Sequence, residues 1–454
     1  MEKMMYTLIV CFGLIIATYC KTPVQLDPEI DLESIGPYEP QQIHLALGKD
    51  PTEIVVTWST WEEIPEALVD LHTPNGLVLF RGYSKLFTDY GSLLRRQYFH
   101  RVTLTDLQPN TTFYYSCGSE DGMSKQYWFR TFPEGNDWSP NLLVYGDLGL
   151  QNPQSVKALI KEVQSKKYDA ILHVGDFAYN FDWENGTVGD KFMNLIQPIT
   201  AYIPYMTCPG NHEGANFFHH YRNRFSMPGN SQSMYYSWNM GPIHFISLDT
   251  EVYYFDFWRM LSQYEWLIAD LKEATKKENR AIRPWIITYG HRPMYCSDAD
   301  DDDCTKRESK VRAGVPIMRD IGLGFGLEKV FYHYGVDLEI WAHEHSYERM
   351  WPLYDHIVYN GSLEEPYVNP PAPVHIVSGS AGCRENTDPF LDKVHYWSAF
   401  RSSDYGYSRM KVHNKTHLYL EQYSDDQDKV IDSFWLVKDL HEMRPLVGDP
   451  DLRS

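Results

Sequence analysis

The sequence lacks an excess of basic residues. Its 41 Lys and Arg side chains stand against 61 Asp and Glu, which gives a formal net charge of −20. Proteins that bind nucleic acid present clustered Lys and Arg on one face, and no such basic stripe is present. We therefore expect no nucleic-acid partner.

Long hydrophobic runs are also missing after the first 20 residues. In that segment Lys3 precedes the apolar stretch Leu8–Ala17, which is shorter than the roughly 20 residues that a membrane-spanning helix needs. This pattern is typical of a secretory signal peptide, to which we assign residues 1–20. Residues 438–454 form a polar tail without a lipidation signal, so we expect no membrane anchor.

Cysteine is scarce, with 7 in 454 residues. Cleavage after Cys20 leaves an odd number, so at least one is unpaired within the chain or pairs with another chain. Cys296 and Cys304 are close in sequence and are the best candidates for a disulfide. We expect secretion, with lysosomal delivery as the alternative, because glycosylation sequons occur at Asn110, Asn185, Asn360 and Asn414.

Residues 37–133 have the pattern of a small β-sandwich. Short segments rich in β-branched and aromatic residues alternate with turns, as in Glu53–Trp58 and Tyr98–Leu104. Asp106–Phe113 resembles the turn into the penultimate strand of a fibronectin type III domain, although Phe113 stands where that family usually has Tyr. We predict an all-β, fibronectin III-like sandwich without chemistry of its own.

In residues 139–437 the pattern changes to strands that alternate with helices, which indicates βαβ units and an α/β catalytic domain. Apolar residues follow helical spacing over residues 156–163 and again over residues 264–271. The second helix is predicted to begin with a capping box at Ser262. Strands in residues 371–437 are expected to complete this domain.

Five apolar segments of this domain each end in a tight turn that carries metal-ligand side chains. Each segment is typical of a buried strand, and catalytic groups of α/β sheets gather outside the carboxyl ends of the strands. We therefore expect the ligands to converge on one edge, with enough oxygen and nitrogen donors for two metal ions. The segments with their turns are Leu142–Gly149, Ala170–Tyr179, Ile203–Glu213, Trp285–Pro293 and Val336–His345.

The individual side chains indicate a metal centre only in combination. Asp147 and Asp176 each follow a glycine, as residues of ordinary turns also do. Tyr179 would need a strongly Lewis-acidic cation such as Fe³⁺ to lose its phenol proton, since its unperturbed pKa is about 10. His343 and His345 lie two residues apart, so both imidazoles point the same way on an extended segment. Each residue alone fits a structural role, whereas the ordered set indicates two metals.

Together the five segments resemble the metallophosphoesterase pattern, and specifically the purple acid phosphatases. Tyr179 is the residue that separates this family from other dinuclear phosphoesterases. The resemblance covers nearly the whole mature chain, including the N-terminal sandwich and Pro373–Cys383, and it is closest to the large, two-domain type. It implies that the α/β catalytic domain is a metallophosphoesterase-type β-sandwich flanked by helices.

The resemblance also implies a role for each site residue. His212 would contact the substrate and protonate the leaving group, and Glu213 would orient His212. Two metals would clamp the phosphate of a monoester, which a hydroxide bound at acidic pH would attack directly, without a covalent phosphoenzyme. The ferric ion would be bound by Asp147, Asp176, Tyr179 and His345, and a second ion, Fe²⁺, Zn²⁺ or Mn²⁺, by Asp176, Asn211, His291 and His343.

Two positions depart from the family pattern. Ala342 replaces the usual Gly before the histidine pair, and the loop after His291 reads Met294–Asp298, without the further histidines of plant relatives. The second acid/base group is therefore not identified. The neighbouring residues 298–303 hold five aspartates, which a solvated turn explains. A charged rim that repels polyanions is the sharper alternative, and the spacing of a known calcium loop is absent.

The resemblance predicts an acid phosphatase that acts on small phosphate monoesters or phosphopeptides. One rival is a phosphodiesterase or nucleotidase on the same scaffold, against which Tyr179 argues. Another is a non-catalytic secreted glycoprotein, against which the complete ligand set argues. The sequence itself selects neither the divalent metal, nor the natural substrate, nor an oligomeric state.

Overall fold

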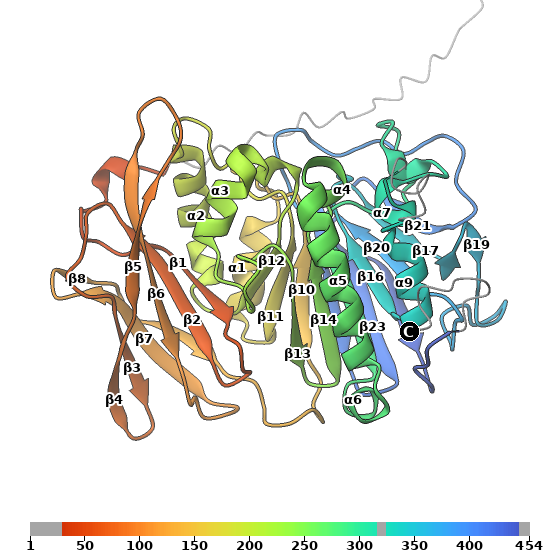
Figure 1. The fold of residues 1–454 in the computed structure, drawn as a ribbon, viewed down its shortest axis with the longest axis horizontal. Coiled ribbons are helices and arrows are strands. Elements are labelled where there is room, and N and C mark those ends of the chain that lie inside the picture. Colours follow the sequence, from red (N-terminus) through yellow and green to blue (C-terminus); the bar gives the residue numbers. More distant parts are fainter. Residues whose placement is uncertain (1–29, 316–323, 445–454) are drawn as a thin grey trace, which may run out of the picture.

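The computed structural model describes residues 30–315 and 324–444, and it places a β-sandwich beside a larger α/β unit (Figure 1). The predicted signal peptide and the end of the polar tail lie outside these ranges. Of the helices in these ranges, none combines the length and the apolar character needed to cross a bilayer. The predicted disulfide between Cys296 and Cys304 is present, and Cys117, Cys208 and Cys383 are free and buried.

The N-terminal unit is the expected sandwich of two antiparallel sheets. Phe113, at the corner where a hydroxyl is missing, is buried and stacks on Phe129 with ring centroids 5.5 Å apart. One sheet has the order β1 (Gln41–Leu47), β2 (Ile54–Thr60), β6 (Arg96–Leu104), β5 (Tyr83–Thr88). The other has the order β4 (Gly76–Arg81), β3 (Leu68–Thr73), β7 (Thr112–Ser119), β8 (Gly122–Met123), with β9 (Tyr127–Arg130) also paired to β7.

The α/β unit contains all five predicted strands, and they belong to two sheets, in agreement with the implied metallophosphoesterase-type β-sandwich. The six-stranded sheet has the order β12 (Tyr205–Cys208), β11 (Ala170–Val174), β10 (Asn141–Tyr145), β22 (Gly406–Val412), β23 (His417–Ser424), β24 (Lys429–Val437). The seven-stranded sheet has the order β13 (Tyr236–Met240), β14 (Ile243–Leu248), β15 (Trp285–Gly290), β16 (Leu338–Trp341), β20 (Val374–Ser378), β17 (Tyr347–Met350), β21 (Ser398–Ser402). A separate hairpin pairs β18 (Leu353–Tyr354) with β19 (Ile357–Val358).

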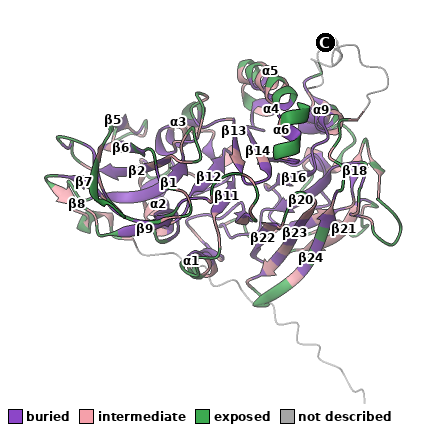
Figure 2. Cartoon of the chain, turned by 90° about the horizontal axis from the view of Figure 1, so that it is seen from below, coloured by how far each residue is buried: buried purple, intermediate pink, exposed green. Residues whose placement is uncertain are grey.

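The apolar residues of each strand explain which strands lie in the interior of the α/β unit. Every residue of β10 except the first, and every residue of β11, β15 and β16, is buried, as expected for parallel strands covered on both faces. β23 alternates buried and partly exposed residues, so only one of its faces packs on the core. Figure 2 shows the resulting buried interior and the exposed outer surfaces of α5 and α6.

Helices cover the sheets and follow the site-bearing turns. The α5 helix places Met260, Leu267 and Leu271 against the seven-stranded sheet. It begins at Phe257 behind the N-cap Asp256, so the predicted capping box at Ser262 is wrong: the Ser262 hydroxyl instead donates to Trp258 O one turn earlier. The helices are α1 (Val156–Gln164), α2 (Thr187–Thr200), α3 (Ala215–Arg224), α4 (Val252–Phe255), α5 (Phe257–Ala274), α6 (Lys277–Ile282), α7 (Lys310–Ala313) and α9 (Leu327–Tyr334), with short 3-10 turns η1 (Leu32–Ser34), η2 (Asn211–Glu213) and η3 (Asp303–Thr305).

A buried polar cluster joins the sandwich to the helices that follow two of the site turns. Asp190 of α2 lies 2.9 Å from Nη2 of Arg224 at the end of α3, and both side chains are fully buried. The carboxylate also accepts hydrogen bonds from the sandwich residues Gln42, Arg95 and Gln97. This cluster therefore fixes α2 and α3 against each other and against the sandwich.

Candidate active site

Two buried carboxylates lie at the ends of β10 and β11. Asp147 and Asp176 both have positive φ, 57° and 52°, which turns the chain sharply after each strand. Gly175 has φ 81°, and a Cβ at this position would lie 2.4 Å from Nδ1 of His291. The glycine before Asp176 is therefore required both by the turn and by the imidazole that packs against it.

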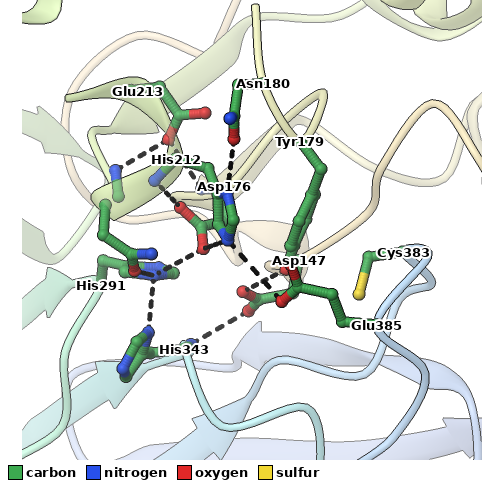
Figure 3. A network of polar contacts seen from close by, with 12 residues as sticks. Asp147, Asp176, Tyr179, Asn180, His212, Glu213, His291, His343, Cys383 and Glu385 are labelled. Atoms are coloured by element: carbon green, nitrogen blue, oxygen red, sulfur yellow. Dashed lines mark hydrogen bonds and ion pairs between the residues drawn. The ribbon is translucent and has the colours of Figure 1, made fainter. Parts of the chain in front are cut away.

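A first group of donors surrounds the phenol of Tyr179. The Tyr179 hydroxyl donates to Oδ1 of Asp147 at 3.0 Å (Figure 3) and lies 2.8 Å from Nε2 of His345. The His345 Nε2 is in turn 3.6 Å from the same Asp147 oxygen. Burial and the charge of Asp147 raise the pKa of Tyr179 well above its usual value, so this phenol loses its proton only to a strongly charged cation.

A second group of donors surrounds Nε2 of His291. This nitrogen lies 3.1 Å from Oδ2 of Asp176, 3.1 Å from Oδ1 of Asn211 and 3.2 Å from Nδ1 of His343. Donors that bind one ion at about 2.0–2.1 Å are spaced roughly 3 Å apart, so the four atoms fit a single divalent ion. The structure thus brings the predicted ligands together in two adjacent groups. That Asp176 bridges them stays a prediction.

In each of the three histidines, one ring nitrogen is hydrogen-bonded to a group outside the two donor groups, and the other ring nitrogen faces the donors. His291 Nδ1 lies 2.9 Å from Val174 O, and His345 Nδ1 lies 2.9 Å from Asn386 O. His343 Nε2 lies 2.6 Å from Oδ2 of Asp302. Such partners fix the tautomer that offers a lone pair to a metal. The donor set therefore fits two cations in composition and in orientation.

The electrostatics of the centre also favour added positive charge. Burial lowers the pKa of His291, but the carboxylates of Asp176 and Asp147 outweigh this effect and raise it to about 10. The pKa of Asp176 is correspondingly held well below its usual value, since the neighbouring histidines overcome the cost of burial. The two buried aspartates thus create a strongly negative potential at the site.

His212 lies at the edge of this centre, on η2. Its backbone N–H donates to Oδ1 of Asp176 at 2.9 Å, and its Nδ1 is hydrogen-bonded to Asn180 (Figure 3). The ring packs against Tyr179 with centroids 4.2 Å apart and the ring planes tilted by 36°, and its Nε2 lies 3.7 Å from Oε2 of Glu385. Burial lowers the pKa of His212, but Asp176 and Glu385 raise it overall. The imidazole is therefore held in one orientation, and its surroundings favour the protonated form.

Glu213 was expected to orient His212, but its hydrogen bonds go to backbone groups of the two turns after β11 and β12. Its carboxylate accepts backbone hydrogen bonds from Asp176, Phe177 and Gly210 at 2.9, 3.0 and 2.9 Å. Burial and the repulsion of Asp176 raise the pKa of Glu213 to about 8. This side chain therefore joins the turn after β11 to the turn after β12, which fixes Asp176 relative to Asn211.

Some residues at the site have no clear sequence signal. Asn180 directly follows Tyr179, and Glu385 follows the Pro373–Cys383 segment, yet neither belongs to a recognisable ligand pattern. Asp302 appears in the sequence only as one of several aspartates. Their contacts with His212 and His343 depend on loops that are far apart in the chain.

The two departures from the family pattern have simple physical explanations. A Cβ on Gly146 would lie 2.5 Å from Cβ of Ala342, so Ala342 is accommodated because residue 146 is glycine. Met294 and Tyr295 are fully buried, and the Tyr295 hydroxyl bonds to Glu328 away from the metal centre. The loop after His291 therefore packs into the core and supplies no second acid/base group.

A hollow of about 650 Å³ opens beside Tyr179. Trp183 and Arg384 line it, with the guanidinium 3.9 Å from the centre of the indole ring. Arg384 Nη2 also lies 3.8 Å from Oε1 of Glu385, whose carboxylate contacts the His212 ring. Arg384 and Glu385 therefore connect the surroundings of His212 with this hollow.

Comparison with known proteins decides the family. Residues 40–131 match the model of the purple acid phosphatase N-terminal domain, residues 140–347 that of calcineurin-like phosphoesterases, and residues 372–433 that of iron/zinc purple acid phosphatase-like protein C. The chain belongs to the purple acid phosphatase family. As a member of this family it is a phosphatase hydrolase, and the predicted fold class is confirmed.

The relatives come from animals and from a plant. Acid phosphatase type 7 of Danio rerio is 53% identical over 411 residues, covering 89% of this chain and 92% of the relative. The Homo sapiens protein of that name is 51% identical, covering 90% and 92%. A purple acid phosphatase from yellow lupin (Lupinus luteus) seeds has the same fold, with a TM-score of 0.73 at 22% identity, over 89% of this chain and 75% of that one.

Proposed function

We propose that this purple acid phosphatase hydrolyses phosphate monoesters at a centre of one ferric ion and one divalent ion, Fe²⁺, Zn²⁺ or Mn²⁺. The position of Tyr179 supports the proposal most directly. Its hydroxyl is buried between Asp147 and His345, where only a strongly Lewis-acidic cation would ionise it. The ferric ion would be held by Asp147, Asp176, Tyr179 and His345, and the divalent ion by Asp176, Asn211, His291 and His343.

When bound, the two cations supply charge that clamps the phosphate and lowers the pKa of water so that a nucleophile exists at acidic pH. The protein residues do the rest. Glu213 fixes the turns that carry Asp176 and Asn211, through three backbone hydrogen bonds. The hydrogen bonds at Nδ1 of His291 and Nε2 of His343 keep both rings from rotating. The donors are therefore set in place before substrate arrives, which reduces the cost of reorganisation.

His212 is the proton donor in this proposal. Asn180 holds Nδ1, so Nε2 is the nitrogen that faces Asp176 at 3.8 Å and the substrate side of the centre. The carboxylates of Asp176 and Glu385 favour the imidazolium. It would donate its Nε2 proton to the leaving oxygen of the ester, which is general acid catalysis. The aromatic contact with Tyr179 keeps the ring in the required plane.

The hollow beside Tyr179 accommodates the leaving group. The Trp183 ring offers an apolar face, and Arg384 stacked on it offers a cation. A small organic monoester or the tyrosine side chain of a phosphopeptide fits a wall of this kind. We therefore place the scissile phosphate at the metal centre and its organic group toward Trp183.

We also propose that the chain enters the secretory pathway and is secreted or delivered to lysosomes. Four sequons support this, since Asn110 and Asn414 are exposed, and Asn185 and Asn360 are partly exposed. Expression of the full chain in animal cells tests it. We expect a product in the medium or in lysosomes whose gel mobility changes on treatment with an endoglycosidase. An unglycosylated cytosolic product would contradict the proposal.

The activity is tested by comparing a phosphate monoester and the corresponding diester, p-nitrophenyl phosphate and bis-p-nitrophenyl phosphate, between acidic and neutral pH. Iron and divalent metal content are measured on the same preparation. We expect two metal ions per chain, at least one of them iron, and a kcat/KM that is far higher for the monoester. A preference for the diester, or activity without iron, would contradict the proposal.

A further inference from the structure

Acidic side chains converge behind the turn that carries His343 and His345. Asp300, Glu344 and Asp388 each place one carboxylate oxygen within 4.8 Å of the other two. Asp298 lies near these three residues, because burial and the charges of Glu348, Asp388 and Asp300 raise its pKa. These four residues, which we call the rear acidic cluster, include none of the proposed ligands of the catalytic centre.

Two members of the cluster are fully buried, which is unusual for carboxylates. Asp298 and Glu344 are both 0% exposed. Neither oxygen of Asp298 has a hydrogen-bond partner, and Oε2 of Glu344 has none. Within residues 30–315 and 324–444 no ion pair joins Asp298, Asp300 or Glu344 to Lys or Arg. A carboxylate removed from water is unfavourable unless it is protonated or paired with a positive charge, and no Lys or Arg of the described residues supplies that charge here.

The fold holds the three contributing segments rigidly in place. His345 N donates to Oδ2 of Asp388 at 2.7 Å, which ties the histidine turn to the segment after Cys383. The Cys296–Cys304 disulfide closes the loop that carries Asp298 and Asp300. Its Cys304 sulfur lies 3.1 Å from Oε1 of Glu344 and has no proton to donate. The carboxylates therefore cannot move apart, and the disulfide does not satisfy Glu344.

We propose that the rear acidic cluster binds a hard divalent cation of the Ca²⁺ class. All the donors are carboxylate oxygens, and the nearby sulfurs are locked in a disulfide, so a soft metal finds no ligand here. Ca²⁺ takes 6–8 oxygen ligands and accepts irregular geometry and bidentate carboxylates. Asp300 is exposed, which gives the ion a path from solvent and room for bound water. By binding Glu344, the ion would hold the His343–His345 turn in position.

The site does not depend on the identity of the catalytic metals. It is tested by titrating Ca²⁺ into the enzyme as isolated, with its catalytic metals in place, by calorimetry and thermal unfolding. We expect one Ca²⁺ per chain and an increase in Tm, with a weaker effect of Mg²⁺, which requires near-ideal octahedral geometry. Iron and divalent content measured before and after the titration must stay constant, which separates this site from the catalytic centre.

Asp298→Asn with Asp300→Asn should abolish both the binding and the Tm increase. Asp301→Asn is the matched control, because its side chain is 94% exposed in the same loop and pairs only with Lys306. If the double variant does not fold, Asp300→Asn alone removes an exposed ligand and should weaken Ca²⁺ binding at least tenfold. No Ca²⁺ binding by the wild-type chain, or unchanged binding by the Asp300→Asn variant, would overturn the proposal and leave carboxyls that share protons.

Discussion

Oδ2 of Asp302 lies 2.6 Å from Nε2 of His343, so one of the five clustered aspartates supports a predicted metal ligand. Burial raises the pKa of Asp302, but the contact with His343 lowers it well below its usual range. Arg292 also pairs with Asp302, at 3.2 Å. The expectation of a solvated turn is therefore wrong for Asp302, for the buried Asp298, and for Asp303, whose carboxylate accepts a hydrogen bond from the Tyr254 hydroxyl. A purely electrostatic rim is reduced to Asp300 and Asp301.

We expect Asp302→Asn to weaken the divalent site and leave the ferric site intact. The variant keeps the size of the side chain but removes the charge that makes His343 a better ligand. Loss of such a partner typically lowers metal affinity about 10–100-fold. Metal analysis after dialysis against a weak chelator should show less divalent ion and unchanged iron. Asp301→Asn is the control, and an equal loss in both variants would contradict the specific role of Asp302.

Asp176→Asn should reduce the content of both ions, because Asp176 lies within 3.1 Å of His291 and is the predicted bridge to the ferric site. Asp147→Asn, in contrast, should reduce iron and largely preserve the divalent ion. Metal content per chain distinguishes the two variants. Full retention of both ions by Asp176→Asn would contradict the assigned bridge.

His212→Ala should slow the hydrolysis of esters with poor leaving groups more than esters of acidic phenols. A general acid contributes roughly 10²–10⁴-fold when the leaving group needs a proton. We therefore expect kcat for an alkyl phosphate to fall by about that factor, and kcat for p-nitrophenyl phosphate to fall much less. Steady-state kinetics on both esters measure the difference. An equal loss would mean that His212 only binds phosphate.

Asp190→Asn should destabilise the protein by about 3–5 kcal/mol at neutral pH, because it leaves the buried Arg224 without its counter-charge. Burial raises the pKa of Asp190, but Arg224 and Arg95 lower it overall. With a folded pKa below the unfolded value of about 3.9, its stabilisation is present above that pH and is lost as pH falls further.

Denaturant unfolding of the wild type and the variant should therefore converge in very acidic solution. Glu66→Gln, which breaks the exposed pair with Arg81, is the control and should cost no more than about 1 kcal/mol. A small effect of Asp190→Asn at neutral pH would contradict the role of this cluster in joining the sandwich to α2 and α3.

The sequence was sufficient for the parts of the site that follow buried strands. Apolar runs predicted β10, β11, β12, β15 and β16, and the side chains after them include the donors found around Tyr179 and His291. The runs themselves did not divide these strands between two sheets, because a fully buried run has no period that identifies its neighbours. The β-sandwich was implied only by the family resemblance. The sequence also missed the start of α5, where Asp256 caps the helix before its regular apolar spacing begins.

Residues whose role depends on the meeting of distant loops could not be predicted. Asp302 and His343 are separated by 41 positions, and Asn180 and His212 by 32. Glu385 lies at His212 only because the segment after β20 returns to the centre. A carboxylate or amide in a polar loop has the same local pattern whether it faces solvent or a histidine.

The visible absorption spectrum of the purified protein, recorded together with its iron content, tests the central claim most directly. A ferric ion bound by the Tyr179 phenolate should give a charge-transfer band in the wild type, and Tyr179→Phe should lose that band while keeping its fold by circular dichroism. A colourless wild-type protein with a full complement of iron, or a Tyr179→Phe variant that keeps the band, would contradict the proposed centre.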